Sequence, residues 1–345
     1  MKIRLMTSAD EANWDAYVHR HPDSTHCHLT GWKHVIENTY GHRSYYLLAE
    51  DGPEVVGLLP LFLIKSLLFG NQLVSMPFLD CGGVLGNSQE VIEALVRQVM
   101  KLGIELKVDS VELRQTTPFN TESGSWRPTG QNKVRMVLQL PPSSEDLFRS
   151  FKAKLRSQIR RPQKEGMRKV LGGSELLGSF YEVFSTSMRD LGSPVHAAKL
   201  FREVCKQLNA KVSVVYHGDR PAAAAIMILF HDNAQIPWAS SLKKYNAFSP
   251  NMLLYWTLLE YACNQGGRYF DFGRSTNGEG TYRFKLQWGT DPVPLNWRKW
   301  SKDGGNGTGL NTHRATFQLA SKTWQRLPLP VTVWLGPIAR KYISL

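Results

Sequence analysis

Apolar and polar positions alternate along the chain with two periods, one typical of helices and one of strands, and the elements come in the same order twice. The first series comprises a strand at 2–6, helices at 8–19 and 30–41, strands at 44–49, 55–64 and 68–76, a helix at 88–102, and strands at 108–113 and 134–140. The second comprises helices at about 175–190 and 195–208, strands at 211–217, 221–230 and 235–242, a helix at 249–264 and a strand at 269–272. The repeated order of two helices, three strands, a helix and a strand predicts a duplicated α/β (α+β) fold.

The segment 268–300 combines aromatic, glycine and basic residues more densely than the rest of the chain. A predicted strand at 268–273 leads through a glycine-containing loop to a predicted short helix at 281–288. Arg274 and Lys285 flank the N-terminus of that helix, where unpaired backbone N–H groups favour an anion. The pattern indicates a phosphate site. The alternative is that both cations are solvated charges around an ordinary strand-to-helix loop.

The same segment resembles a known family. Asp271-Phe-Gly-Arg-Ser followed by Gly-x-Gly-x-Tyr-x-Phe-Lys285-x-x-Trp-Gly is similar to the FemAB family, most closely to its members associated with the exosortase/PEP-CTERM system. Similar motifs at 75–83, 156–161 and 242–256 extend the resemblance over roughly residues 1–300. The resemblance implies two tandem GNAT-like (acyl-CoA N-acyltransferase-like) domains that transfer an acyl or aminoacyl group to an amine. We expect these domains at 1–142 and 143–304, followed by a helical, apolar tail at 305–345.

Amine acylation requires a neutral amine, and a base can supply it by removing a proton. Asp80 in a glycine-containing turn and Asp271 at the end of a predicted strand are the candidates. Alternatively, Asp80 caps its turn, Asp271 is a structural carboxylate, and deprotonation is assisted by the substrate itself. Tyr282 is expected either to donate a hydrogen bond to the substrate or to pack, and Lys285 is the principal candidate of the catalytic set.

The turn at 243–251 bears on the donor. In GNAT enzymes the corresponding turn carries a glycine-containing signature whose backbone holds the pyrophosphate of CoA. The turn here has no glycine, which makes close backbone approach to a pyrophosphate harder. We therefore expect either an aminoacyl-tRNA or an acyl-CoA as donor, and no metal. Substrate-binding candidates in and beside the turn are Lys243, Lys244 and Asn251.

Basic residues crowd the segment between the two halves, at 143–169. The pattern predicts a helix that Ser143 and Asp146 begin as a capping box and that Pro162 ends or kinks. Its cations far outnumber its acids, so it is either a solvated face or a surface for phosphates. The family resemblance favours contact with substrate or RNA through Arg156, Arg160 and Arg161.

Composition adds wider limits. The 345 residues carry a net charge of +13, which favours polyanionic partners without choosing among them. Four cysteines without a CxxC pair give no disulfide or zinc framework, and the histidines around Cys27 lack a second ligand cluster at zinc-finger spacing. The first residues lack the apolar core of a signal peptide, so we expect a cytoplasmic protein.

Three functions are consistent with these patterns. The first is a Fem-like transferase acting on an amine of a nucleotide- or lipid-linked cell-envelope precursor. The second is an acyl-CoA-dependent N-acyltransferase in exopolysaccharide modification, and the third is a non-catalytic basic module that binds RNA or a membrane. The tail, with Trp324, Trp334 and Tyr342 beside several cations, is suited to peripheral membrane contact; alternatively it packs back on the domains. Its prolines predict that residues 327–337 do not form a long helix.

Overall fold

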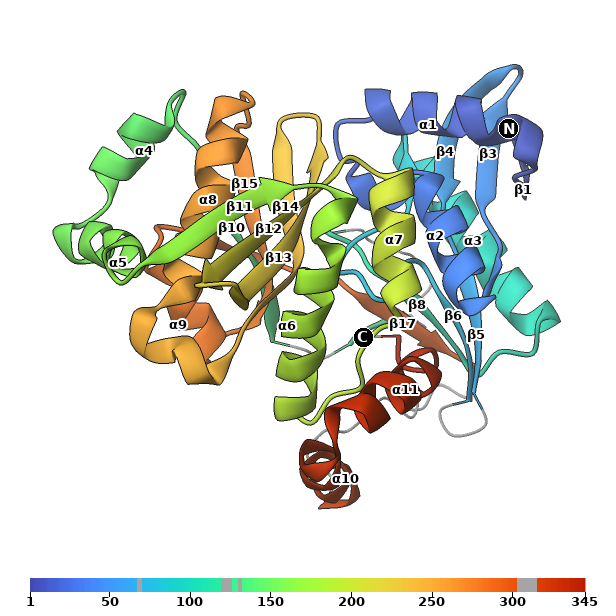
Figure 1. Cartoon of the computed structure of the whole chain (residues 1–345). Helices are drawn as coiled ribbons and strands as arrows, with labels where there is room; N and C mark the ends of the chain where they lie inside the picture. Colours follow the sequence, from blue (N-terminus) through green and yellow to red (C-terminus); the bar gives the residue numbers. More distant parts are fainter. Residues whose placement is uncertain (67–69, 119–125, 130–131, 303–314, 345) are drawn as a thin grey trace. The chain divides into compact units, whose positions relative to one another are not determined.

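The computed structural model describes residues 1–66, 70–118, 126–129, 132–302 and 315–344 (Figure 1). Contacts divide these residues into two compact units. The first unit contains the described residues of Met1–Gln131, Pro294–Arg314 and Arg340–Leu345. The second contains those of Asn132–Val293 and Ala315–Ala339. The chain therefore leaves the first unit, builds the body of the second, and returns twice.

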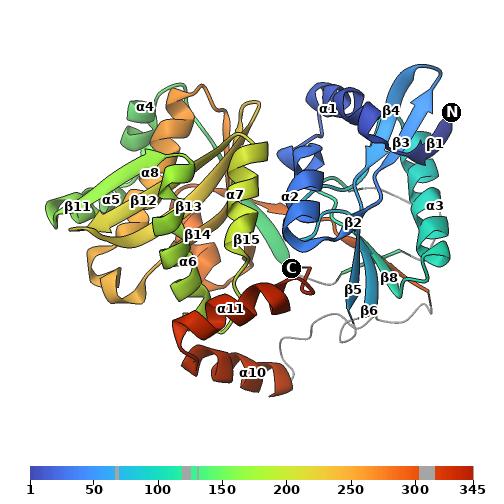
Figure 2. The ribbon, with the colours of Figure 1, turned by 45° about the vertical axis from the view of Figure 1, so that its right-hand side comes forward.

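The first unit is built on two sheets, with orders β1-β3-β4-β7 and β2-β5-β6-β8-β17-β9. Its strands are β1 (Lys2–Leu5), β2 (Arg43–Ser44), β3 (Leu47–Asp51), β4 (Glu54–Leu59), β5 (Phe62–Ser66), β6 (Gly70–Val74), β7 (Leu85–Gly86), β8 (Ser110–Leu113), β9 (Arg127–Pro128) and β17 (Arg298–Ser301). Its longer helices are α1 (Glu11–Arg20), α2 (Gly31–Tyr40) and α3 (Gln89–Glu105). Helix α3 lies beside β3 and β4 (Figure 2) and buries Val91, Leu95 and Val99 against the sheets.

The single strand predicted at 55–64 is divided into β4 and β5. Pro60 stands at the break, where it has no N–H to donate to a neighbouring strand. The main chain therefore bends there, and Tyr45 N donates to Leu61 O at 2.7 Å beyond the bend. Consequently β4 and β5 belong to different sheets of the first unit.

A buried arginine joins separate parts of the first unit. Arg114, at the end of β8, is fully buried. Its Nη1 donates to the carbonyl oxygens of Met76 and Leu79, at 3.0 and 2.5 Å, and its Nη2 donates to Ser344 O at 2.9 Å. Its Nε donates to Glu112 Oε1 at 2.9 Å, which balances the buried charge. One side chain thus ties the 76–79 loop and the chain's end to the sheet.

The second unit has one sheet with the order β11-β12-β13-β14-β15-β10-β16 among its described residues. The strands are β10 (Lys133–Gln139), β11 (Met167–Gly172), β12 (Ala210–His217), β13 (Arg220–Phe230), β14 (Asn233–Ser241), β15 (Tyr269–Thr276) and β16 (Asp291–Pro294). The helices are α4 (Ser144–Ser150), α5 (Ala153–Lys164), α6 (Leu177–Asp190), α7 (Ala198–Gln207), α8 (Pro250–Asn264), α9 (Gly280–Leu286), α10 (Ala315–Arg326) and α11 (Leu329–Arg340). Helix α8 is buried along most of its length and supplies Leu253, Leu258 and Leu259 to the core.

The two units share one pattern, which confirms the predicted duplication. In the first, α3 connects the parallel neighbours β6 and β8; in the second, α8 connects the parallel neighbours β14 and β15. Antiparallel strands precede this crossover in both units. Parallel strands need such a crossover, because a tight turn can join only antiparallel ones.

Three expectations need correction. The strand predicted to close the first half, β10, lies instead in the second unit's sheet beside β15. The single basic helix is two helices, separated at Phe151 and Lys152, and its last cations lie on β11. The tail's prolines do not prevent a helix: Pro328 and Pro330 stand at the start of α11, where the first N–H groups have no partner within the helix.

The Ser143–Asp146 cap is confirmed, with Asp146 N donating to Ser143 Oγ at 3.1 Å.

We predict that Arg114→Met destabilises the first unit by about 3–5 kcal/mol, because it leaves the half-buried Glu112 carboxylate and three carbonyl oxygens without their donor. Amide hydrogen exchange of β6 and β8 measures the loss. The matched control is Arg97→Met on α3, an exposed arginine 3.6 Å from Glu93, with an expected effect below about 1 kcal/mol. Equal effects of the two substitutions would contradict the role of Arg114.

Candidate active site

The two parallel strands at the centre of the second unit separate soon after they meet. Strands β14 and β15 pair from Asn233–Tyr269 to Gln235–Asp271. Beyond this point β14 continues against β13, and β15 continues against β10. We call the divergence the fork. Diverging strands expose main-chain groups and side chains at the middle of a sheet, where the rest of the backbone is paired.

Asp271 holds the fork together. Its Oδ2 accepts from Arg135 Nε of β10 at 2.7 Å and from Gln235 Nε2 of β14 at 2.9 Å. Its Oδ1 accepts from Gly273 N at 2.8 Å, and its side chain is nearly buried. Three donors from three strands therefore surround one carboxylate. This geometry favours the structural interpretation of Asp271 over the role of a base.

Lys285 reaches the fork from α9. Its Nζ donates to Gly273 O at 3.0 Å and to Arg274 O at 2.9 Å, and the residue is 7% exposed. The two diverging strands, β14 and β15, are the arms of the fork. Gly273 on β15 has φ of 76°, and a Cβ there would lie 3.0 Å from Ile236 O on β14. Glycine is suited to this position because it adopts positive φ without strain and allows the arms to approach closely. The ammonium is thus held by main-chain oxygens inside the fork.

Aromatic packing fixes the helix that carries Lys285. Trp288 is buried and contacts Phe272 and Tyr255, whose rings lie 6.0 and 6.2 Å from it. Burial among these groups raises the pKa of Tyr255, so its hydroxyl stays protonated. Phe284 packs against the same cluster. Tyr282 is half-buried and also contacts this core.

The turn before α8 lies on the arm formed by β14. Lys243 and Lys244 belong to a short 3-10 helix, Lys243–Phe248, and both are exposed. Asn251 lies in the first turn of α8 and is half-buried. Ser249, where the predicted helix 249–264 begins, has φ of 57° and its side chain makes no capping bond. Pro250 is the first residue of α8.

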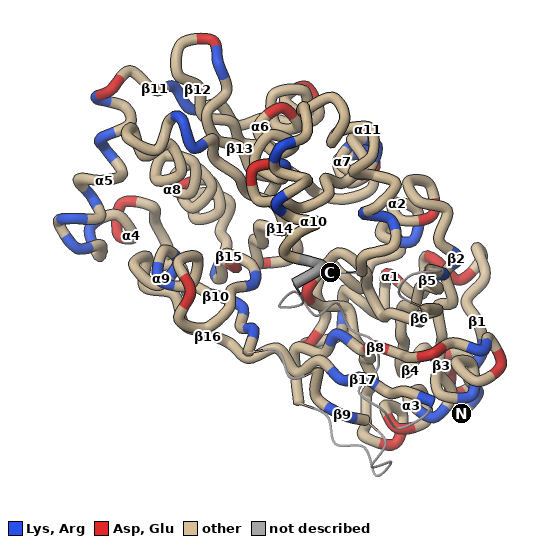
Figure 3. The backbone as a smooth tube through the Cα atoms, turned by 90° about the horizontal axis from the view of Figure 1, so that it is seen from below, with Lys and Arg blue, Asp and Glu red and all other residues tan. Residues whose placement is uncertain are grey.

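The three arginines of α5 differ in their surroundings. Arg156 is half-buried, and its Nη1 donates to Arg149 O and Phe151 O at 3.0 Å, which closes the C-terminus of α4. Arg160 lies over the ring of Phe148 with 4.9 Å to its centroid, and Arg161 is exposed. Leucine, isoleucine and proline side chains bury the opposite face of α5. Lys and Arg, drawn in blue, are frequent along α5 (Figure 3).

Asp80 belongs to the first unit, so it is described apart from the fork. Its carbonyl oxygen accepts from Trp297 Nε1 at 2.9 Å, and the residue is half-buried. The neighbouring Cys81 thiol lies against Cys27, whose pKa is raised by burial and by Cys81. A raised pKa keeps the Cys27 thiol neutral, which argues against a nucleophile here.

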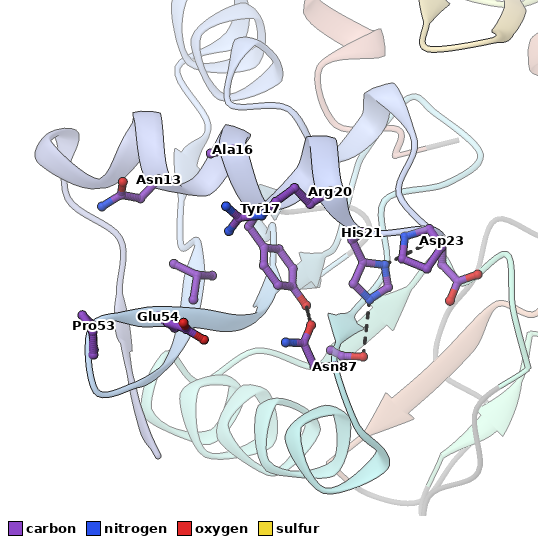
Figure 4. Close-up of a pocket in the computed structure, with 12 residues that line it drawn as sticks. Asn13, Ala16, Tyr17, Arg20, His21, Asp23, Pro53, Glu54 and Asn87 are labelled. Carbon is purple, nitrogen blue, oxygen red and sulfur yellow. Dashed lines mark hydrogen bonds between the residues drawn. The ribbon is translucent and has the colours of Figure 1, made fainter.

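A polar cavity of about 790 Å³ lies in the first unit between α1, the β3–β4 turn and β7 (Figure 4). The Tyr17 hydroxyl is 2.8 Å from Asn87 Oδ1 and 3.0 Å from Val56 O. The His21 ring accepts from Asp23 N at 3.2 Å. None of the candidate residues from the sequence lines this cavity. Among the described residues, no group of three or more His, Cys, Asp or Glu is placed to hold a metal.

The sequence missed Arg135 and Gln235, the partners of Asp271. Both are polar residues within predicted strands that are otherwise largely apolar. A polar side chain inside such a strand was the available signal, because burial of a polar group requires a partner. The identity of the partner depends on which strands become neighbours, and that information is not local.

Comparison with known proteins identifies the fold around the fork. Residues 149–286 match the family described as "Acetyltransferase (GNAT) domain". The chain is similar to a crystal structure of FemX, with a TM-score of 0.68 and 15% identity over 87% of this chain and 97% of that one. It is also similar to the C-terminal domain of a putative lysylphosphatidylglycerol synthetase from Agrobacterium fabrum, with a TM-score of 0.58 and 12% identity over 92% and 96% of the two chains. A tandem GNAT protein from the clavulanic acid biosynthesis pathway gives a TM-score of 0.56 and 11% identity over 88% and 98%.

No curated protein matches the chain. At the identities above, the solved structures show the fold alone. The chain has a mixed α/β fold with two tandem GNAT-like domains, as predicted. The segment that matches the acetyltransferase family contains the fork and Lys285.

A double-mutant cycle tests the carboxylate at the fork. We predict that Asp271→Asn and Arg135→Met each destabilise the second unit by about 3 kcal/mol, and that the double variant loses less than the sum. Thermal unfolding measures the three losses. Lys133→Met on the same strand, whose Nζ bonds the Thr276 hydroxyl, is the control and is expected to cost about 1 kcal/mol. Additive losses would show that Asp271 and Arg135 act independently.

Proposed function

We propose that this protein is a Fem-like transferase that moves an aminoacyl or acyl group to an amine of a nucleotide- or lipid-linked cell-envelope precursor. The observation that carries the proposal is the buried Lys285 ammonium, held at the fork of a domain that matches the acetyltransferase family. The likeness to FemX over nearly the whole of that chain supports the Fem-like form. Association with an exosortase/PEP-CTERM system and with exopolysaccharide is a narrower part of the same proposal.

In the proposed reaction, the amine nitrogen attacks the carbonyl carbon of the donor's ester or thioester. The carbonyl oxygen gains negative charge, a C–N bond forms, the bond to the donor's oxygen or sulfur breaks, and the amine's proton leaves. Lys285 contributes positive charge beside the carbonyl oxygen, which is most effective in a site that excludes water. Asp271 already accepts three hydrogen bonds, so we assign deprotonation to the substrate itself.

Two features favour aminoacyl-tRNA as the donor over acyl-CoA. The turn before α8 offers no glycine to a pyrophosphate, and Pro250 removes one N–H donor from the start of the helix. The exposed face of α5 carries cations with few acids beside them, which suits a phosphate backbone. The acceptor is then a phosphate-bearing glycan or lipid-linked precursor, handled on the cytoplasmic side of the membrane. The acyl-CoA enzyme remains the second candidate because of the family match.

Lys285→Met tests the proposed chemistry. We expect the rate of transfer to fall about 10²–10³-fold, the usual loss when a group that stabilises an oxyanion is removed. Release of the acyl group from charged tRNA and from acyl-CoA to an amine acceptor measures the rate and identifies the donor. The control is Lys206→Met, an exposed lysine on α7. If Lys285→Met fails to fold, or transfers at the full rate, the role of Lys285 is limited to its structural bonds with Gly273 and Arg274, and the proposed chemical role is contradicted.

Salt dependence tests the basic face. Changing Arg160, Arg161 and Lys164 to Gln should lower the salt slope of tRNA binding by roughly one for each phosphate that is no longer bound. Arg156 is left intact because it closes the end of α4. The matched control changes three exposed cations of α7 to Gln: Lys199, Arg202 and Lys206. An equal salt slope of tRNA binding in the two triple variants would show that the exposed face of α5 is a solvated surface that does not bind phosphates.

A further inference from the structure

The C-terminal helices α10 and α11 differ in charge from the rest of the chain. From residue 304 to the end the sequence contains no Asp or Glu. The cations in this stretch are Arg314, Lys322, Arg326, Arg340 and Lys341. Within the two helices, Lys322 and Arg326 are exposed and lie four residues apart, so they share one side of α10. An acid-free surface with clustered cations attracts an anionic partner.

One face of this helical hairpin is attached to the second unit. Gly336 is buried so closely against the main chain at Val195 that a Cβ there would lie 3.0 Å from Val195 N. Ser321 of α10 similarly approaches Gly192, where a Cβ would lie 2.7 Å from Ser321 O. Thr332, one turn before Gly336, is buried as well. These small residues fix the orientation of both helices on the unit.

The opposite face of α11 carries an apolar ridge in solvent. Pro330, Trp334 and Ile338 are four residues apart and all exposed, Trp334 by 70% and Ile338 by 55%. Leu319 on α10 is 68% exposed. Most large exposed apolar residues are scattered singly on a soluble protein. On α11, Pro330, Trp334 and Ile338 form one ridge, and the exposed cations Lys322 and Arg326 lie on α10.

We propose that this hairpin is a contact surface for an anionic lipid bilayer. The apolar ridge enters the boundary between head groups and acyl chains, Trp334 lies at head-group depth, and Lys322 and Arg326 meet anionic head groups. Acidic residues would oppose such a contact, and the segment has none. Among the described residues no helix is long and apolar enough to cross a bilayer. The contact needs neither donor nor acceptor, so it is independent of the proposed transfer.

Vesicle flotation of the full chain tests the contact. Vesicles contain phosphatidylglycerol and phosphatidylcholine in equal parts, or phosphatidylcholine alone. Trp334→Ser with Ile338→Ser should weaken binding to the anionic vesicles about tenfold or more, because apolar area is no longer buried. Lys322→Gln with Arg326→Gln should weaken it about thirtyfold at low salt, since each cation near an anionic surface contributes roughly fivefold. All four residues named are exposed, so the variants are expected to fold.

The controls change similar residues elsewhere. Ile104→Ser removes an exposed apolar residue of α3, and Lys101→Gln with Lys206→Gln removes two exposed cations. Unchanged binding by the controls and weakened binding by both hairpin variants supports the proposal. Equal binding by all variants, or no preference for phosphatidylglycerol, overturns it. If Trp334→Ser with Ile338→Ser converts a dimer to a monomer without changing flotation, a second copy covers the ridge and the proposal is also overturned.

Discussion

The candidate site depends on a single buried carboxylate. Asp271 is the last residue of β15 that pairs with β14, and its oxygens accept from Arg135, Gln235 and Gly273. A buried charge in the middle of a sheet is costly unless it is paired and fully hydrogen-bonded. The three donors meet this requirement and, in doing so, fix the point at which the strands separate. The arms can diverge without loosening the sheet because the carboxylate holds their base.

This arrangement explains how the side chain of a lysine on α9 comes to lie at the fork of a sheet. Where the strands diverge, Lys285 donates to the carbonyl oxygens of Gly273 and Arg274. The ammonium therefore has a structural reason to be there before any substrate binds. Its charge is positioned in advance, which is the condition under which a charge stabilises a reaction without reorganisation. The two hydrogen bonds that hold Lys285 at the fork also position its charge for the proposed chemistry. The stability of the fork and any activity are therefore linked.

The sequence predicted much of the fold, because its local signals were strong. The strands predicted at 211–217, 221–230 and 235–242 correspond to β12, β13 and β14, and the helix predicted at 249–264 corresponds to α8. Non-local relations could not be predicted in this way. The pattern at 134–140 identifies a strand but does not specify its sheet, so β10 was placed in the wrong unit. For the same reason the sequence does not identify Arg135 as a partner of Asp271, or the main-chain oxygens of Gly273 and Arg274 as partners of Lys285.

The path of the chain also constrains the order in which the two units can complete their folding. The first unit's larger sheet needs β17, and Arg114 needs Ser344 at the far end of the sequence. The sheet of the second unit, by contrast, is complete once residue 294 has been synthesised. On the ribosome, where folding usually proceeds from the N-terminus, the later unit can therefore form its sheet first. The larger sheet of the first unit gains β17 only after that point, whereas β1, β3, β4 and β7 can already pair while the second unit is being synthesised.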